Sequence, residues 1–381
     1  MASCAYHLDL LGEYPSRRFD VVEPEKPLWR NGLAVRLPNH LGDAVMALPA
    51  LAALKRIVPD HCALYVIAPA GQIDFYSALP CVDGIVMLHN LHCRWGRAEW
   101  RELRRLGLGI GVLFNNSLRD AIEMRLAGIR SLYGAAARCR SLLLKRAFRF
   151  PARPGTGPAR EHLGNRYLEI AYALGAPREA IEPPDFRLWF RADEMRGELA
   201  AIAAHPRLLI LAAGAAYGAA KRWPAENFRT VARWWTRCGG IVAVTGSAGE
   251  AEIGEAVISG LPGGKAFDLC GKTSLGELMR LLKSAAALVA NDSGTMHLAG
   301  ALGVGGVAVF GPTDLTATGP VFGNWRLLYR KLECSPCFRR ECPKHDAKCI
   351  RSITPAMVIR ELRDLCREQR KLPRGAYRRQ R

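Results

Sequence analysis

The 381-residue chain lacks the features that mark membrane-spanning and secreted proteins. No run reaches the roughly 18–20 apolar residues that cross a bilayer as a helix. The longest apolar stretch, residues 208–220, is short and contains two glycines. The first residues mix acids, bases and prolines and lack the basic-then-apolar order of a secretory signal. We therefore expect a cytoplasmic protein.

Tandem repeats and low-complexity tracts are also absent. Aromatic residues make up only 8% of the chain, but apolar residues make up 49%, which is enough for substantial buried cores. This apolar fraction excludes wholesale disorder. At about 150 residues per domain, the length predicts two or three domains.

Acidic residues are scarce relative to basic ones. The chain has 35 Asp and Glu against 54 Lys and Arg, a formal net charge of +19, and its sequence pI is about 9.8. This excess indicates an anionic partner: a nucleic acid, a lipid headgroup surface or a phosphorylated substrate. No RNA- or DNA-binding module accompanies the charge, so a basic nucleic-acid-binding protein is the weaker alternative and we expect no nucleic acid partner.

From about residue 33 the hydrophobic pattern alternates between short strands and amphipathic helices. Residues 33–37 and 63–68 are predicted strands, and residues 43–57 are a predicted helix between them. The alternation restarts in the second half, where the predicted strands are residues 208–211, 241–245, 285–290 and 307–310. Such alternation predicts parallel sheets, so we expect two α/β halves.

Ligands of open α/β sheets bind beyond the carboxyl ends of the strands, which directs attention to four loops. The first loop, residues 38–43, ends at Asp43, at the start of a predicted helix. The positive end of the helix dipole keeps such a carboxylate ionised, so Asp43 is a candidate base for a hydroxyl proton. An ordinary helix-capping acid is the commoner role for this placement.

The second loop, residues 212–224, is rich in Gly and Ala and contains Lys221. Small residues let backbone amides approach a phosphate closely, and a lysine adds a point charge. The loop does not contain the G-x-x-x-x-G-K-[ST] pattern of a Walker motif. A flexible crossover loop fits the same composition.

The third loop has the sequence Asn291-Asp-Ser-Gly-Thr-Met-His297 and joins a predicted buried strand to a helix. Ser293 and Gly294 would place free N–H groups at the helix N-terminus, which is a ready anion site. His297 falls in the first helical turn, where it faces the same ligand or serves a structural role. Asp292 alternatively caps the helix.

The fourth loop, residues 311–314, is typical of a turn when taken by itself. Taken together, the loops of the second half predict a nucleotide-diphosphate site that faces an acidic residue of the first half. Isolated Gly-x-Gly patterns, such as residues 109–111, are too short to indicate a dinucleotide fingerprint.

These motifs resemble the heptosyltransferases of lipopolysaccharide core assembly, glycosyltransferase family 9, and most of all the type that adds the second heptose. The resemblance rests on the order and spacing of residues 41–50, 214–224, 246–247, 291–297 and 311–312. It implies the GT-B architecture, an α/β fold in which two facing Rossmann-like domains leave an interdomain cleft.

The pattern along the chain, together with the resemblance, predicts a division of the chain. The parts are an N-terminal extension, an N-terminal Rossmann-like acceptor domain, a C-terminal Rossmann-like ADP-sugar domain with a Cys-rich segment at 334–349, and a terminal helix with a basic tail. Their expected bounds are residues 1–31, 32–190, 191–350 and 351–381.

The activity implied by the family is inverting, metal-independent transfer of heptose from ADP-L-glycero-β-D-manno-heptose to the lipopolysaccharide inner core, without a required cofactor. Asp43 would be the general base, and Lys221 would neutralise the leaving diphosphate. The implied donor contacts are Gly214, Tyr217, Glu252, Thr273, Asp292, Ser293, Gly294 and His297. A GT-B enzyme that uses another nucleotide sugar or acceptor is the alternative within this class.

The basic charge is most one-sided in the first half, where residues 125–160 contain nine Arg or Lys and no Asp or Glu. Since this half binds the acceptor in the family, the resemblance implies an anionic lipid A–Kdo glycolipid as acceptor. The expected acceptor contacts are Asn39, His40, Arg125 and Arg130.

A second basic cluster, residues 94–105, interleaves five arginines with Trp95 and Trp100. Tryptophan favours membrane interfaces, so this cluster suggests a surface at the inner membrane and a peripheral location there. A solvated basic helix face with packed tryptophans is the alternative.

Four of the twelve cysteines cluster near the C-terminal end. A disulfide framework is not expected in a cytoplasmic chain. Four thiols with a nearby histidine suit a structural zinc site, although the spacing is not the paired C-x2-C form, and reduced structural thiols fit as well. The residues concerned are Cys334, Cys337, Cys342 and Cys349.

Overall fold

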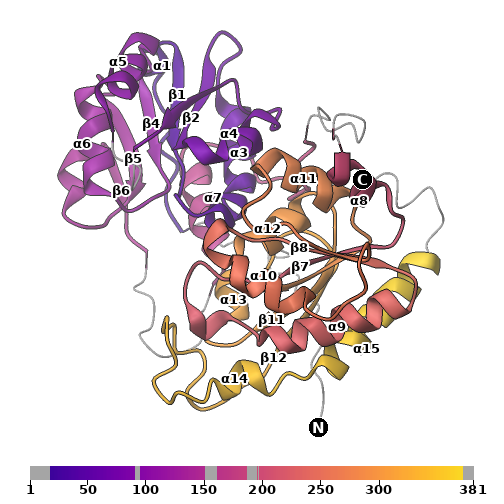
Figure 1. The fold of residues 1–381 in the computed structure, drawn as a ribbon. Helices are drawn as coiled ribbons and strands as arrows, with labels where there is room; N and C mark the ends of the chain where they lie inside the picture. Colours follow the sequence, from indigo (N-terminus) through magenta and orange to yellow (C-terminus); the bar gives the residue numbers. More distant parts are fainter. Residues whose placement is uncertain (1–17, 91–94, 151–160, 187–194, 196, 372–381) are drawn as a thin grey trace. The chain divides into compact units, whose positions relative to one another are not determined.

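The computed structural model describes residues 18–90, 95–150, 161–186, 195 and 197–371. Contacts within the chain divide them into two compact units, each with its own six-stranded sheet (Figure 1). Of the described residues, 18–90, 95–150 and 162–186 belong to the N-terminal unit, and 161, 195 and 197–371 belong to the C-terminal unit.

The sheet of the N-terminal unit is parallel throughout, in the order β3-β2-β1-β4-β5-β6. All residues of β1 and β4 are buried, as expected for parallel strands covered by helices on both faces. The strands are β1 (Gly32–Arg36), β2 (Ala63–Pro69), β3 (Gly84–Leu88), β4 (Ile110–Leu113), β5 (Ser131–Ala135) and β6 (Arg146–Phe148). The helices are α1 (Lys26–Trp29), α2 (Leu41–Met46), α3 (Leu48–Ile57), η1 (Ala70–Gln72), α4 (Ile73–Ser77), α5 (Arg97–Leu106), α6 (Leu118–Leu126), η3 (Arg140–Leu143) and α7 (Leu163–Ala173).

The strand order reverses at β1, which has β2 on one side and β4 on the other. In open α/β sheets, the loops that follow the two adjacent strands at such a reversal diverge and leave a crevice at the carboxyl ends of these strands. Here the two strands are β1 and β4. Residues 37–40 follow β1 and residues 114–117 follow β4. The topology of this unit therefore places a site between these two loops.

The sheet of the C-terminal unit is also parallel and has the order β12-β11-β10-β7-β8-β9. Here the order reverses at β7, between β8 and β10. The strands are β7 (Leu208–Ala212), β8 (Ile241–Val244), β9 (Ala266–Asp268), β10 (Ala287–Asn291), β11 (Gly306–Phe310) and β12 (Trp325–Tyr329). The helices are α8 (Gly197–Ala204), η5 (Ala219–Lys221), α9 (Ala225–Arg237), η6 (Ala248–Glu250), α10 (Ala251–Ile258), α11 (Leu275–Ser284), α12 (Gly294–Ala301), α13 (Leu315–Thr318), α14 (Lys348–Arg351) and α15 (Pro355–Lys371).

The terminal helix α15 lies beside α9 in the C-terminal unit (Figure 1). Its apolar side chains Val358 and Leu362 join a buried cluster that includes Phe228 of α9. The indole of Trp223 donates to the carbonyl of Ile353 at 2.7 Å and fixes the segment that leads into α15. The last helix is therefore part of the core of the C-terminal unit.

The predicted parallel sheets are confirmed, but the predicted helix over residues 43–57 is two helices. Ala47 separates α2 from α3, and Pro49 lies in the first turn of α3. A proline has no N–H to continue the preceding helix, and its fixed φ suits a helix start. Among the residues described, no helix combines the length and the apolar character that crossing a bilayer requires.

Candidate functional site

A polar cavity of about 410 Å³ opens between the loops that follow β1 and β4. Asn39, His40 and Asp43 line it, so the structure brings these three predicted residues together. Asp43 is half-buried in the first turn of α2. The positive end of the helix dipole favours the ionised carboxylate at this position. The cavity therefore offers a placed proton acceptor.

The cations of this cavity differ from the predicted ones. Arg36, Arg119 and Arg138 line it. Arg125 instead donates to the carbonyl of Arg130, just before the amino end of β5, and neither residue lines the cavity. A run of basic residues indicates a basic face, whereas residues that follow the carboxyl end of a strand line the crevice. Arg119 follows a predicted apolar run, so the carboxyl-end rule would have identified Arg119 as a candidate.

A buried ion pair forms part of the cavity wall. The Nε atom of Arg36 donates to Asp120 at 2.9 Å, and both side chains are almost fully buried. Arg36 also donates to the side-chain oxygen of Asn39 at 2.6 Å. Asp120 further accepts from the Trp95 indole at 2.8 Å and from the Asn115 amide. This network fixes the amides of Asn39 and Asn115 at the cavity wall.

An ion pair also joins the two loops at the switch point of the C-terminal unit. Lys221 Nζ lies 2.6 Å from Asp292 Oδ2, and Thr313 donates to the same oxygen at 2.6 Å. The buried amide of Asn291 accepts from the backbone N–H of Trp223 at 3.0 Å. The predicted residues Lys221 and Asp292 are therefore in contact, and Asn291 ties their loops together.

Tyr217 stands at the exposed edge of this site. The Lys221 ammonium lies 4.8 Å from the centre of its ring, and the Arg340 guanidinium lies 5.5 Å from it. Its hydroxyl donates to the carbonyl of Phe338 at 2.6 Å. Gly218 allows Arg340 to approach, because a Cβ there would lie 2.5 Å from the Arg340 carbonyl. Sequence reasoning missed Arg340, which lies far from Tyr217 along the chain.

Gly214 packs against an acid that the sequence did not single out. A Cβ at Gly214 would lie 2.0 Å from Glu250, so only glycine fits without displacement. Glu250 in turn accepts from the N–H and the hydroxyl of Ser247, both at 2.8 Å. The predicted donor contact Glu252 is exposed on α10, and Thr273 is half-buried in the turn before α11. Of these acids, Glu250 is therefore the one that contacts Gly214.

The N-terminus of α12 lies in the loop after β10. Gly294 is its first residue, and Ser293 precedes it without a side-chain cap hydrogen bond. His297 is in the first turn and 4% exposed. Unpaired N–H groups and the helix dipole make such a terminus an anion site. It lies next to Asp292 along the chain, in the same loop.

Comparison with known proteins shows to which family this chain belongs. Residues 97–348 match the model of glycosyltransferase family 9 (heptosyltransferase). The chain belongs to this family. The matched residues include β4, β5 and β6 of the N-terminal unit and the whole sheet of the C-terminal unit.

This family 9 glycosyltransferase has relatives and structural neighbours of nearly its own length. It is 27% identical over 348 residues to the lipopolysaccharide heptosyltransferase 2 of Salmonella typhimurium, covering 87% of this chain and 97% of the relative. The E. coli ADP-heptose lps heptosyltransferase II structure matches with a TM-score of 0.72 at 23% identity, covering 89% of this chain and 99% of that one. The structure of E. coli heptosyltransferase WaaC with ADP matches with a TM-score of 0.65 at 17% identity, covering 87% and 99%. These matches confirm the predicted GT-B fold class.

The Cys-rich segment of this family 9 glycosyltransferase lines a separate cavity of about 430 Å³. All four clustered cysteines contribute to its wall, beside Ala220 and Pro312. Burial, and then the neighbouring Cys337 thiol, raise the pKa of Cys349 to about 11. In the part of the chain that the structure describes, no three His, Cys, Asp or Glu side chains are grouped to hold a metal ion. The expected zinc site is therefore not supported.

The Cys-rich segment braces two loops of the predicted donor site. The N–H of Ala220 donates to the carbonyl of Arg340 at 2.9 Å, beside Lys221. The N–H of Phe338 donates to the carbonyl of Pro312 at 2.8 Å, and the Ser335 hydroxyl donates to the carbonyl of Gly311 at 2.6 Å. The segment thus holds the second and the fourth loops in place.

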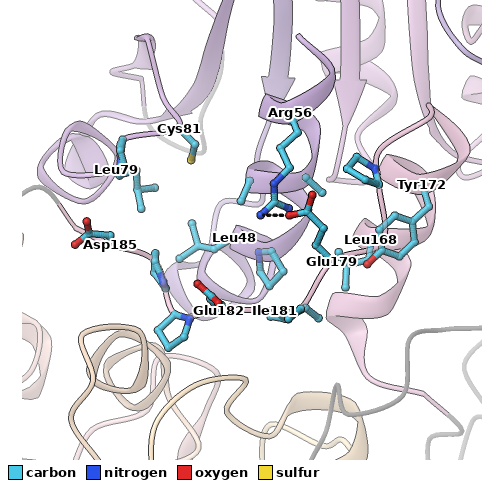
Figure 2. Close-up of a pocket in the computed structure, with 18 residues that line it drawn as sticks. Leu48, Arg56, Leu79, Cys81, Leu168, Tyr172, Glu179, Ile181, Glu182 and Asp185 are labelled. Atoms are coloured by element: carbon cyan, nitrogen blue, oxygen red, sulfur yellow. Dashed lines mark ion pairs between the residues drawn. The ribbon is translucent and has the colours of Figure 1, made fainter. Parts of the chain in front are cut away.

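Figure 2 shows another cavity, of about 230 Å³, in the N-terminal unit. It lies between α3, α7 and residues 177–185, and its wall includes Leu48, Leu168 and Ile181. The Arg56–Glu179 ion pair, 2.9 Å long and well exposed, is at its edge. None of the predicted site residues lines this cavity, and it lies apart from the loops at the switch point.

Proposed function

We propose that this enzyme transfers heptose from ADP-L-glycero-β-D-manno-heptose to the lipopolysaccharide inner core, as a cytoplasmic protein peripheral to the inner membrane. The observation that carries the proposal is the chemistry at the two switch points: a placed carboxylate, Asp43, in one unit and a basic anion site around Lys221 in the other. The names of the relatives support the sugar and the acceptor, and a related structure holds ADP.

The proposal assigns the donor to the C-terminal unit. The N–H groups at Gly294 would bind the diphosphate, together with the ammonium of Lys221. Arg340 adds a second cation near the ring of Tyr217. The negative charge that develops on the leaving ADP would be stabilised by these fixed groups, which need no reorganisation during the reaction. The proposed mechanism therefore requires no cofactor.

The pair formed by Lys221 and Asp292 refines the predicted role of Asp292. A carboxylate beside a diphosphate would repel it if it stood alone. Because Asp292 is held by Lys221 and Thr313 at 2.6 Å each, its charge is offset, and it orients the ammonium. We therefore assign Asp292 a positioning role and Lys221 the direct contact with the leaving group.

The proposal assigns the acceptor to the N-terminal unit. Asp43 takes the proton of the acceptor hydroxyl while the hydroxyl oxygen forms a bond to the anomeric carbon. The bond from that carbon to the diphosphate oxygen breaks on the opposite face, and ADP leaves with the electron pair. One displacement inverts the anomeric configuration.

The cavity beside Asp43 suits an anionic, sugar-bearing acceptor such as the lipid A–Kdo glycolipid. Asn39 and His40 offer hydrogen bonds to sugar hydroxyls, and Arg119 and Arg138 offer charge to carboxylates or phosphates. Arg125 and Arg130, which do not line this cavity, belong to the outer basic surface of the same unit.

Nucleotide selectivity and product stereochemistry test the proposal together. ADP should raise the thermal unfolding temperature of the protein more than UDP or GDP at equal concentration. Transfer from ADP-heptose to the lipid A–Kdo acceptor should give a product of inverted anomeric configuration by NMR. A larger shift with UDP or GDP would instead favour another nucleotide sugar, and retention of configuration would exclude the single displacement.

A further inference from the structure

Exposed apolar side chains gather on one part of the N-terminal unit. Across the described parts of the chain, five large apolar side chains are well exposed: Ile73, Ile122, Leu126, Leu142 and Tyr217. Three of the five come from α6 and η3, which pack against each other. The side chain of Leu142 is 93% exposed and that of Leu126 is 58% exposed. Single exposed apolar residues are ordinary, but a group on adjoining elements marks an interaction surface.

An open groove of about 620 Å³ extends this surface from α6 to α5. Trp100 and Leu126 line it, together with Arg97 and Arg101. The guanidinium of Arg104 lies 5.1 Å from the centre of the Trp100 ring. The helices α5 and α6 lie on the same side of the unit (Figure 1). We call α5, α6 and η3 together the α5–α6–η3 surface.

The charge of the α5–α6–η3 surface is strongly positive. Residues 124–150 contain seven Arg or Lys and no Asp or Glu. Exposed arginines also line α5, where the exposed acid is Glu102. On α6 the acid near the apolar residues is the half-buried Glu123. The exposed basic residues of α5, of α6 and of the segments that flank η3 are Arg97, Arg101, Arg104, Arg105, Arg119, Arg130, Arg138, Lys145, Arg146 and Arg149.

We infer that the α5–α6–η3 surface docks on an anionic phospholipid bilayer. Leu142, Leu126 and Ile122 enter the boundary between headgroups and acyl chains, Trp100 lies at headgroup level, and the arginines contact lipid phosphates. A nucleic acid would satisfy the arginines but would leave the leucines in water. A second copy of the chain would bring two basic surfaces together, so charge complementarity favours the lipid.

The docking surface adjoins the cavity that holds Asp43. Arg119 lines that cavity and Leu126 ends the same helix, about 10 Å further along at 1.5 Å per residue. Arg138 also lines the cavity and lies four residues before Leu142. A bilayer at this surface would therefore present a lipid-anchored sugar close to the cavity. This last step rests on the proposed transfer reaction, whereas the docking itself concerns only the proposed peripheral location.

Vesicle co-sedimentation of the full chain tests the docking. The protein should sediment with vesicles of phosphatidylethanolamine and phosphatidylglycerol and stay in solution with vesicles of phosphatidylcholine alone. The double change Leu126→Glu and Leu142→Glu should weaken binding at least about tenfold, since it removes inserted carbons and adds charges that the anionic lipids repel. The matched control is Ile73→Glu, an exposed apolar residue on α4 of the same unit, which should bind as the wild type does.

Other outcomes of this experiment would overturn the inference. Equal binding of both lipid compositions, or equal loss in the double variant and the Ile73→Glu control, would contradict it. A dimer that the leucine changes convert to a monomer would show that a second copy covers the surface. A separate readout isolates the proposed function: transfer to an acyl-free, water-soluble acceptor should not change in the double variant. If the wild type does not transfer heptose to that acceptor, the proposed function is contradicted, but the result on membrane docking still stands.

Discussion

The two units of the chain have the same strand order, and in both an ion pair crosses the switch point. In the N-terminal unit Arg36 of β1 pairs with Asp120, after β4. In the C-terminal unit Lys221 pairs with Asp292, and the two follow β7 and β10, the equivalent strands. In each unit the cation lies in or after the first strand, and the acid lies after the fourth strand. The same topology therefore brings the same charges together twice.

The difference between the two pairs lies in their surroundings. The Arg36 side chain is 1% exposed, and its remaining donors bind protein oxygens. The Lys221 side chain is 12% exposed and lies beside the exposed Tyr217 ring. The first pair is thus enclosed in the wall of the cavity that contains Asp43, whereas the second pair is partly open to solvent. The predictions below test this contrast.

The largest effect is expected for the carboxylate of the N-terminal unit. Asp43→Asn should lower the rate of heptose transfer by about 10³-fold, because the acceptor hydroxyl then lacks its base. The unfolding temperature should stay near that of the wild type. Asp60→Asn, in an exposed loop of the same unit, is the control and should keep full activity. Turnover near the wild-type rate in Asp43→Asn would remove Asp43 from the mechanism.

Removal of the acid in the buried pair should act on stability. Asp120→Ala leaves the Arg36 charge buried without its partner and should lower the free energy of unfolding by about 3–5 kcal/mol, measured with urea. Glu179→Ala breaks the exposed pair with Arg56 and should cost under about 1 kcal/mol. Similar losses in the two variants would refute the structural role of the Arg36–Asp120 pair.

The pair of the C-terminal unit should show the opposite behaviour. Lys221→Met should lower kcat by about 10²-fold, since a cation at the leaving diphosphate is lost, and should weaken protection by ADP. The loss of stability should be smaller than in Asp120→Ala, because Thr313 still donates to Asp292. Lys265→Met, an exposed lysine of the same unit, is the control. An unchanged kcat in Lys221→Met would mean that this ion pair, like the Arg36–Asp120 pair, has only a structural role.

The smallest effect is expected at the edge of the donor site. Tyr217→Phe removes the hydroxyl that donates to the Phe338 carbonyl but keeps the ring that lies near the two cations. One hydrogen bond of this kind is worth about 1 kcal/mol, so ADP affinity should fall about fivefold by calorimetry. Tyr65→Phe in the N-terminal unit should not change ADP affinity. A complete loss of binding would mean that the hydroxyl contacts the nucleotide.

Local sequence signals predicted the parts of this molecule that depend on neighbours along the chain. Apolar runs located the strands, and the rule of carboxyl ends selected the loops of Asp43, Lys221 and Asp292. The break at Ala47 was missed, although Pro49 signalled it. Glu250 was not predicted, because its contact with Gly214 joins loops that lie far apart along the chain. The adenosine contact expected of Glu252 stays a prediction.

Contacts between distant segments could not be predicted in this way. Arg36 and Asp120 are 84 residues apart, and their pairing depends on β1 and β4 being neighbours, which periodicity does not reveal. The cation of Arg340 reaches Tyr217 only through the fold of the Cys-rich segment. The run at residues 125–160 drew attention by its charge, but charge density does not indicate which side chains line a cavity.

The brace formed by the Cys-rich segment also affects the order in which the enzyme matures. Tyr217 bonds to a carbonyl 121 residues later in the chain, and Lys221 is held beside the Arg340 carbonyl. During synthesis the small-residue loop emerges from the ribosome long before the segment that supports it. Domains generally fold as units while the chain is being made. The N-terminal unit can thus complete its cavity early, whereas the proposed donor site is finished only near the end of translation.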